Sequence, residues 1–184
     1  DGQRVLVRLS KGSRGRFPHG EIILILTNED SLEADFAVVQ AEFDLPIGHP
    51  DGVVDEAAAL PAVEDGAAWP DRTDLRDLPT ITIDPRDARD FDDAVSLEML
   101  DGGRSRIGVH IADVSAYVQP GSLIDQSAES RGTSIYLPGR VIPMLPERLA
   151  NDLCSLRPEE DRLAKSVFMV FSSEGKLIET EICR

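Results

Sequence analysis

Residues 94–100 and 106–111 are two runs of alternating apolar residues that flank Asp101-Gly102-Gly103. A short Asp-Gly sequence between such runs predicts a β-hairpin, because glycine reaches the positive φ angles of a tight turn without strain. If the turn centres on its first glycine, antiparallel pairing places residue i opposite about residue 204 − i. Residues 90–93 then lie beside residues 111–114, so this hairpin decides which side chains gather at its open end.

Other segments around the hairpin carry clear signals of their own. Ser122 and Asp125 match the capping box that begins a helix, and Gly132 suits the position just past the end of that helix. Pro146 fits the first turn of a second helix, at residues 146–154. Together these elements predict the α+β class, with a mixed sheet and flanking helices in the main domain. The remaining predicted strands are residues 3–10, 20–27, 80–83, 163–171 and 176–182.

Charge is distributed unevenly along the chain. The net charge is −15, and between Phe17 and Asp71 there are thirteen acidic residues but no lysine or arginine. Residues 11–16, by contrast, form a basic turn that could meet phosphates. We predict that residues 31–72 are an acidic linker that has a little local structure, such as a short helix, and no part in a core. This charge argues against a protein that binds nucleic acid with its whole surface, but a bound cation reverses the sign locally.

Five carboxylates occupy residues 84–93, directly between the strand predicted at 80–83 and the first strand of the hairpin. A run of charge is often only a solvated loop. Here Phe91 lies inside the run, where it can anchor the loop. Like charges this close together also destabilise one another unless a cation compensates them. We therefore expect a bound cation at this segment.

Hard divalent cations meet this condition, because Mg²⁺ prefers oxygen ligands such as carboxylates, water and phosphate. In extended backbone Asp90 and Asp92 point to one side and Asp93 to the other. A bent segment could therefore serve two metal positions, and Asp84 could complete the set of ligands. Two such ions can bind the attacking and the leaving oxygen of a phosphoryl transfer.

Two other acidic motifs do not fit this segment. An EF-hand loop that begins at Asp90 would require glycine at position 95 and glutamate at position 101, where the chain has Val95 and Asp101. The Asp-x-Asp-Asp motif of some terpene cyclases belongs to helical proteins. Predicted strands flank the motif here, so we discount this interpretation.

The hairpin register adds a further carboxylate. Asp113 is the acidic residue within 111–114, and the predicted pairing places it beside the acidic segment. We predict Asp113 either as a metal ligand or as a carboxylate that supports one. The alternative is a hydrogen-bonded carboxylate in a turn, and a slip of one residue in the register would turn Asp113 to the other face.

A series of motifs runs in a fixed order along residues 73–172. They are 73–79 (TDLRDLP), 82–94 (TIDPRDARDFDDA), 111–114 (IADV), 131–138 (RGTSIYLP), 141–146 (VIPMLP) and 151–156 (NDLCSL). In this order they resemble the RNB catalytic domain of the ribonuclease II and ribonuclease R family. The residues before 30 resemble the end of the cold-shock, OB-type domain that precedes it. The resemblance implies three parts: 1–30 as the end of an OB-type domain, 31–72 as the acidic linker, and 73–184 as a truncated, N-terminal part of an RNB domain.

The resemblance implies a 3′→5′ exoribonuclease that hydrolyses single-stranded RNA to nucleoside 5′-monophosphates with the help of metal ions. Asp84, Asp90, Asp92 and Asp93 match the four catalytic, metal-binding aspartates of the family. Tyr136 matches the tyrosine that stacks on a base near the 3′ end. Stacking suits an enzyme without base preference, because every base has a π-face. Without the resemblance, Tyr136 would be interpreted as an aromatic residue of a core or a turn.

The expected cofactor is Mg²⁺, for which Mn²⁺ can substitute, and the expected partner is single-stranded RNA. No apolar run is long enough to cross a membrane. The two distant cysteines, Cys154 and Cys183, lack the spacing of metal ligands, which favours a reduced, cytoplasmic compartment. A monomer is expected, although the sequence leaves the oligomeric state open.

Two alternatives stay open at this point. A relative that only binds RNA, as a non-catalytic scaffold, would be expected to lack one or more of the four aspartates, and all four are present. A metal-binding structural domain would show metal-dependent stability and no interaction with RNA. The RNB domain is also much longer than the part present here, so we expect a piece of a longer protein that can be inactive alone.

Overall fold

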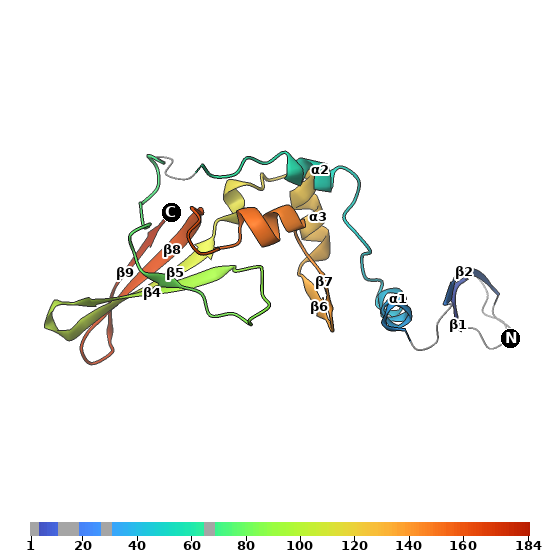
Figure 1. Ribbon diagram of the computed structural model, residues 1–184, viewed down its shortest axis with the longest axis horizontal. Helices are drawn as coiled ribbons and strands as arrows, with labels where there is room; N and C mark the ends of the chain where they lie inside the picture. The colour runs from blue at the N-terminus through green and yellow to red at the C-terminus, as the bar shows by residue number, and fades with distance from the viewer. Residues whose placement is uncertain (1–3, 11–18, 27–30, 65–68) are drawn as a thin grey trace. The chain divides into compact units, whose positions relative to one another are not determined.

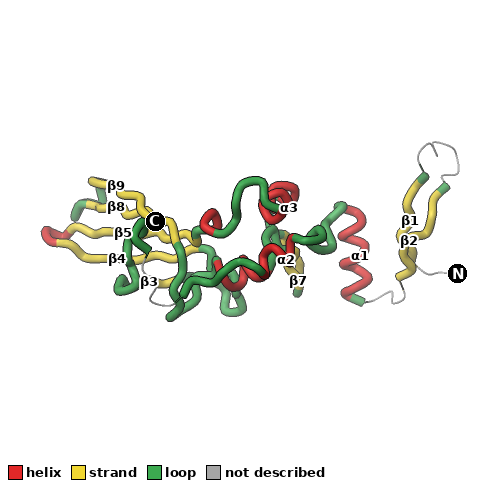
Figure 2. The backbone as a smooth tube through the Cα atoms, turned by 90° about the horizontal axis from the view of Figure 1, so that it is seen from above, coloured by secondary structure: helices red, strands yellow, loops and turns green. Residues whose placement is uncertain are grey.

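The structure, a computed structural model, forms two compact units, Asp1–Gly48 and His49–Arg184. Among the described residues, no helix is both long and apolar enough to cross a membrane. The structure describes residues 4–10, 19–26, 31–64 and 69–184 (Figures 1 and 2).

The first unit contains a two-stranded antiparallel sheet and one helix. Strand β1 (Arg4–Leu9) pairs with β2 (Gly20–Leu26), which confirms the two predicted strands. Helix α1 (Leu32–Glu42) begins after Ser31, whose side chain accepts a hydrogen bond from a backbone N–H of the first turn. The basic turn predicted at residues 11–16 lies outside the described residues.

A five-stranded sheet with the strand order β3-β4-β5-β8-β9 dominates the second unit (Figure 1). Asp93 lies opposite Ile111 and Leu100 opposite Arg104, which is the register predicted from the turn. The α+β class is confirmed, but the sheet is not mixed, because all its described pairings are antiparallel. Each connection brings the chain back into the sheet at the end where the previous strand finished, so neighbouring strands run in opposite directions. The strands are β3 (Thr80–Ile81), β4 (Asp93–Leu100), β5 (Arg104–Ala112), β8 (Ala164–Phe171) and β9 (Leu177–Cys183).

The segment between β5 and β8 carries helix α3 (Leu123–Arg131) with the predicted caps. The Ser122 side chain accepts a hydrogen bond from the backbone N–H of Asp125, and Gly132 ends the helix with a φ of 72°. The second predicted helix forms as a π-helical turn, η3 (Leu149–Leu153). The other elements are the strands β6 (Ile135–Leu137) and β7 (Arg140–Ile142), which form a hairpin, and the 3-10 turns η1 (Asp101–Gly103) and η2 (Val114–Ala116).

Helix α2 (Val53–Ala58) belongs to the core of the second unit. Val53 and Ala57, one helical turn apart, are buried in the same cluster as Ile124 of α3 and Leu149 of η3. The prediction that residues 31–72 contribute nothing to a core is therefore wrong for this helix. Its acidic residues do not enter the core, because only the Val53–Ala57 side of the helix is buried. The predicted domain boundaries stay predictions.

A row of buried polar side chains crosses the sheet. His110 of β5 lies 2.9 Å through Nε2 from the Ser96 hydroxyl of β4, and 2.8 Å through Nδ1 from the Ser166 hydroxyl of β8. Gly108 leaves the space that the side chains of His110 and Phe168 fill. This row joins the three neighbouring strands β4, β5 and β8 by side-chain hydrogen bonds.

Candidate active site

The predicted acidic segment, residues 84–93, connects β3 to the start of β4 and is called the acidic loop. Asp93 is the first residue of β4 and pairs with Ile111. The backbone N–H of Ala112 donates to the carbonyl of Asp92 over 3.0 Å. Pairing with β5 therefore fixes the backbone of these two aspartates directly.

The middle of the loop is held by the turn that follows η3. The hydroxyl of Ser155 donates to the carbonyl of Arg89 (2.7 Å) and accepts from the N–H of Phe91 (3.2 Å). The N–H of Leu156 donates to the carbonyl of Phe91 over 2.9 Å. Asp90 thus lies between two residues whose backbone groups bond to this turn. Phe91 contributes both its backbone N–H and its carbonyl to these bonds.

The charges of the other three predicted aspartates act on Asp92. The pKa of Asp92 is raised above its usual value, first because protein atoms displace water around it, and then by the charges of Asp90, Asp93 and Asp84. Since Coulomb interactions weaken with distance, the four carboxylates lie in one neighbourhood. Asp87, the fifth carboxylate of the segment, is not among the charges that raise this pKa.

The donors of this neighbourhood fit a hard divalent cation, because all four are carboxylates. As the side chains stand, no three His, Cys, Asp or Glu residues in the described part of the chain converge closely enough to hold a metal ion. Mutual repulsion keeps like charges apart, and a cation would draw them together. The four carboxylates are therefore near one another without forming a closed cage.

Tyr136 reaches this neighbourhood from β6. Its hydroxyl donates a 2.7 Å hydrogen bond to Oδ2 of Asp90. This bond, partial burial and the charges of Asp90 and Asp92 raise the pKa of Tyr136 to about 12. The phenol is therefore protonated at neutral pH and stays a donor. The residue is 65% exposed, so its ring is accessible for stacking.

Asp113 belongs to a different network. It is buried, and its carboxylate accepts hydrogen bonds from Arg72 and Ser115, each over 2.7 Å, with Lys165 3.6 Å away. Desolvation opposes its charged form, but these hydrogen bonds and positive charges outweigh it and lower the pKa of Asp113. Asp113 is not among the charges that raise the pKa of Asp92. The contacts are those of a hydrogen-bonded carboxylate at a turn, so we leave Asp113 out of the proposed chemistry.

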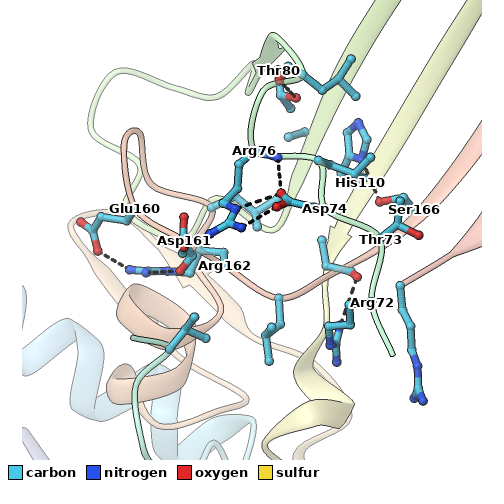
Figure 3. A pocket seen from close by; sticks show the side chains of 18 of the residues that line it. Arg72, Thr73, Asp74, Arg76, Thr80, His110, Glu160, Asp161, Arg162 and Ser166 are labelled. Carbon is cyan, nitrogen blue, oxygen red and sulfur yellow. Dashed lines mark hydrogen bonds and ion pairs between the residues drawn. The ribbon is translucent and has the colours of Figure 1, made fainter. Parts of the chain in front are cut away.

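A pocket of about 920 Å³ lies beside the row of buried polar side chains and is lined by His110 and Ser166 (Figure 3). None of the four aspartates lines it. Four of the five arginines that line it are engaged with carboxylates; Arg162, for example, pairs with Glu160 over 2.5 Å. The same holds for Arg72, Arg76 and Arg157. Because the predicted aspartates lie outside this pocket, the acidic loop is the candidate active site.

Sequence reasoning missed Ser155, whose hydroxyl holds the backbone of the acidic loop. Nothing in hydrophobic periodicity or charge singles out one serine that follows an apolar turn. The motif at residues 151–156 contains it, but its contacts with Arg89 and Phe91 join segments about 65 residues apart. Only the tertiary structure shows this connection.

Comparison with known proteins gives consistent results. Residues 72–184 match the RNB domain. The chain is 46% identical over 188 residues to ribonuclease R of Chlamydia muridarum, covering 100% of this chain and 27% of the relative. RNase R of Mycoplasma genitalium in complex with double-stranded RNA superposes with a TM-score of 0.89 at 28% identity, covering 98% of this chain and 32% of that one. The same protein in complex with ribose methylated single-stranded RNA gives 0.83 at 31% identity, covering 90% and 26%.

The chain spans about a quarter of the length of the curated relatives that it matches. The acidic loop and Tyr136 both fall within the matched residues 72–184.

Proposed function

The chain belongs to the RNB domain family, and on this premise we propose that its acidic loop supplies the catalytic carboxylates of a 3′→5′ exoribonuclease. The proposed substrate is single-stranded RNA, and the proposed products are nucleoside 5′-monophosphates. One observation carries the proposal: Asp84, Asp90, Asp92 and Asp93 lie on one loop within the residues that match the RNB domain, and pairing with β5 fixes the backbone of Asp92 and Asp93. Several carboxylates held on one loop provide the oxygen ligands that a hard divalent cation prefers.

The proposed chemistry is metal-assisted hydrolysis of the last phosphodiester bond. Bound Mg²⁺, or Mn²⁺ in its place, would lower the pKa of the attacking water and stabilise the leaving 3′-oxygen. Asp92 and Asp93 would be the ligands with the least freedom to move, because β5 holds their backbone. Asp84 and Asp90 would complete the set from the loop.

Tyr136 would connect substrate binding to this site. Its ring would stack on a base near the 3′ end of the RNA, which is independent of base identity. Its hydroxyl holds Asp90 through the 2.7 Å hydrogen bond. The side chain of Tyr136 would then position both the terminal nucleotide and the carboxylate of Asp90.

The partner assignment is supported by the two Mycoplasma genitalium structures, which contain single-stranded and double-stranded RNA. The chain itself has a net charge of −15. Most of the affinity for RNA would therefore come from phosphate contacts outside the acidic loop. This separation makes RNA binding and cleavage testable independently.

The test is the variant Asp92→Asn in the protein at its natural length, with Asp87→Asn as the matched control. Asp92→Asn should lower the rate of nucleotide release by more than about a hundredfold, beyond the usual effect of losing a residue that only supports a metal ligand. RNA affinity should change little, since phosphate contacts dominate it. Asp87→Asn removes the same charge from the same loop and should keep nearly the full rate.

Turnover of Asp92→Asn at the wild-type rate would sink the assignment. If the unmodified protein binds RNA but releases no nucleotide in either metal, the non-catalytic scaffold replaces the exoribonuclease as the better account.

A further inference from the structure

The hydroxyl of Ser155 forms hydrogen bonds to the backbone on both sides of Asp90, a proposed metal ligand. Ser155 is fully buried, and its hydroxyl bonds to the backbone of Arg89 (2.7 Å) and of Phe91 (3.2 Å). Asp90 lies between those two residues. The hydroxyl uses both its donor and its acceptor capacity on the acidic loop.

The backbone of this loop lacks the regular pairing that a strand provides, since β4 begins only at Asp93. Polar backbone groups in such a segment need partners. Ser155 and the N–H of Leu156 provide three of them, all directed at residues 89–91. Fixing the backbone on both sides of Asp90 limits the directions in which its carboxylate can point.

The turn that carries Ser155 is itself held in place. The guanidinium of Arg162 donates from Nε to the carbonyls of Ser155 (2.9 Å) and Asp152 (3.2 Å). Its side chain is only 12% exposed and also pairs with Glu160, a contact visible in Figure 3. Ser155 is therefore a rigid support and not a mobile side chain that happens to touch the loop.

We propose that Ser155 is a positioning residue for the hydrolysis proposed above. Its hydroxyl sets the backbone of the acidic loop so that Asp90 can share a divalent cation with Asp92 and Asp93. The inference rests on the proposed function, because it concerns the same carboxylates. A purely structural serine would affect stability, whereas a positioning serine affects the concentration of metal that the site requires.

The test is Ser155→Ala in the protein at its natural length, with Ser166→Ala as the matched control. Ser166 is also a buried serine with a hydrogen-bonded hydroxyl, but its partner is His110 in the sheet. For each variant, one measures kcat, KM for RNA and the Mg²⁺ concentration that gives half the maximal rate. The rise of the unfolding temperature with added Mg²⁺ gives a second readout, independent of activity.

Ser155→Ala should raise the half-maximal Mg²⁺ concentration by about tenfold to a hundredfold, the usual effect of removing a group that orients a metal ligand. It should leave KM for RNA nearly unchanged. Ser166→Ala should leave the Mg²⁺ requirement at the wild-type value even where it lowers the unfolding temperature. Ser155→Cys, which keeps a weak donor and acceptor of similar size, should fall between wild type and alanine, and it replaces the alanine variant if that one does not fold.

The inference would be overturned if Ser155→Ala keeps the wild-type values of both the half-maximal Mg²⁺ concentration and the rise of the unfolding temperature with Mg²⁺. If the alanine variant does not fold, the same result for Ser155→Cys would overturn it. This failure differs from a failure of the proposed function, in which Asp92→Asn would turn over RNA at the wild-type rate.

Discussion

Among single residues, the acidic loop illustrates what sequence can and cannot predict. Asp84, Asp90, Asp92 and Asp93 could be selected from spacing and resemblance, and the structure brings them into one electrostatic neighbourhood. The hydrogen bond between Tyr136 and Asp90 could not be selected, because it joins residues 46 positions apart. Contacts of this kind depend on how a short hairpin lies against a loop, and neither leaves a periodic pattern.

The Tyr136 hydroxyl can be tested separately from its ring. Tyr136→Phe keeps the aromatic surface for stacking but removes the bond to Asp90. We expect RNA affinity within about twofold of wild type and a rate lowered by up to about tenfold, as for one solvent-accessible hydrogen bond to a charged group. Tyr136→Ala should lower both the affinity for RNA and the rate of nucleotide release. Equal rates for wild type and Tyr136→Phe, measured beside an inactive alanine variant, would show that only the ring matters.

The raised pKa of Asp92 makes a prediction about stability without metal. A carboxyl whose pKa is higher in the folded than in the unfolded state lowers stability once pH rises above the unfolded value of about 3.9. Asp92→Asn removes this penalty and should raise the unfolding temperature of the metal-free protein at pH 7, by on the order of 1–2 °C. The difference should vanish well below pH 4, where both states are protonated.

Thermal unfolding in a chelator at pH 7 and at pH 3 measures this directly. A lower unfolding temperature for Asp92→Asn than for wild type at pH 7 would contradict the assigned direction of the shift.

At the level of secondary-structure elements, strong local signals in the sequence were sufficient to predict an element and its position, whereas weak signals were not. The turn at Gly102 predicted both the β4–β5 hairpin and its register, and the capping residues predicted α3. Helix α2 was missed as a core element because acidic neighbours masked the buried pair Val53 and Ala57. The β6–β7 hairpin was missed because its strands have three residues each, too few to show an alternating pattern.

Gly108 is the position where the sheet is least tolerant of a side chain. A Cβ there would clash with the Ser96 hydroxyl and would lie 2.7 Å from Nε2 of His110 and 2.9 Å from Phe168. Gly108→Ala should therefore destabilise the second unit by about 3 kcal/mol or more, as expected for overpacking against a rigid core. The control Gly102→Ala meets no atom within 4 Å, and its positive φ should cost only about 1 kcal/mol.

Unfolding midpoints in urea measure the difference between the two glycine variants. Similar midpoints would mean that Ser96, His110 and Phe168 are not packed around Gly108 as described.

For the molecule as a whole, the family and the α+β class followed from the order of motifs, whereas the sheet directions did not. The chain covers about a quarter of its relatives, and several apolar side chains on its sheet are exposed, among them Leu97, Met99 and Ile182. The net charge of −15 favours phosphate contacts outside the acidic loop as the main source of RNA affinity in our proposal. What these 184 residues contribute in our account is the chemistry: a loop of carboxylates fixed at the start of β4.

That contribution is tested most directly with a 3′-labelled single-stranded RNA and the protein at its natural length, assayed beside this chain alone. We predict release of labelled nucleoside 5′-monophosphate by the natural-length protein only when Mg²⁺ or Mn²⁺ is present, and little or no release by this chain alone. Release that continues in a chelator, or no release in either metal with all four aspartates intact, would contradict the account.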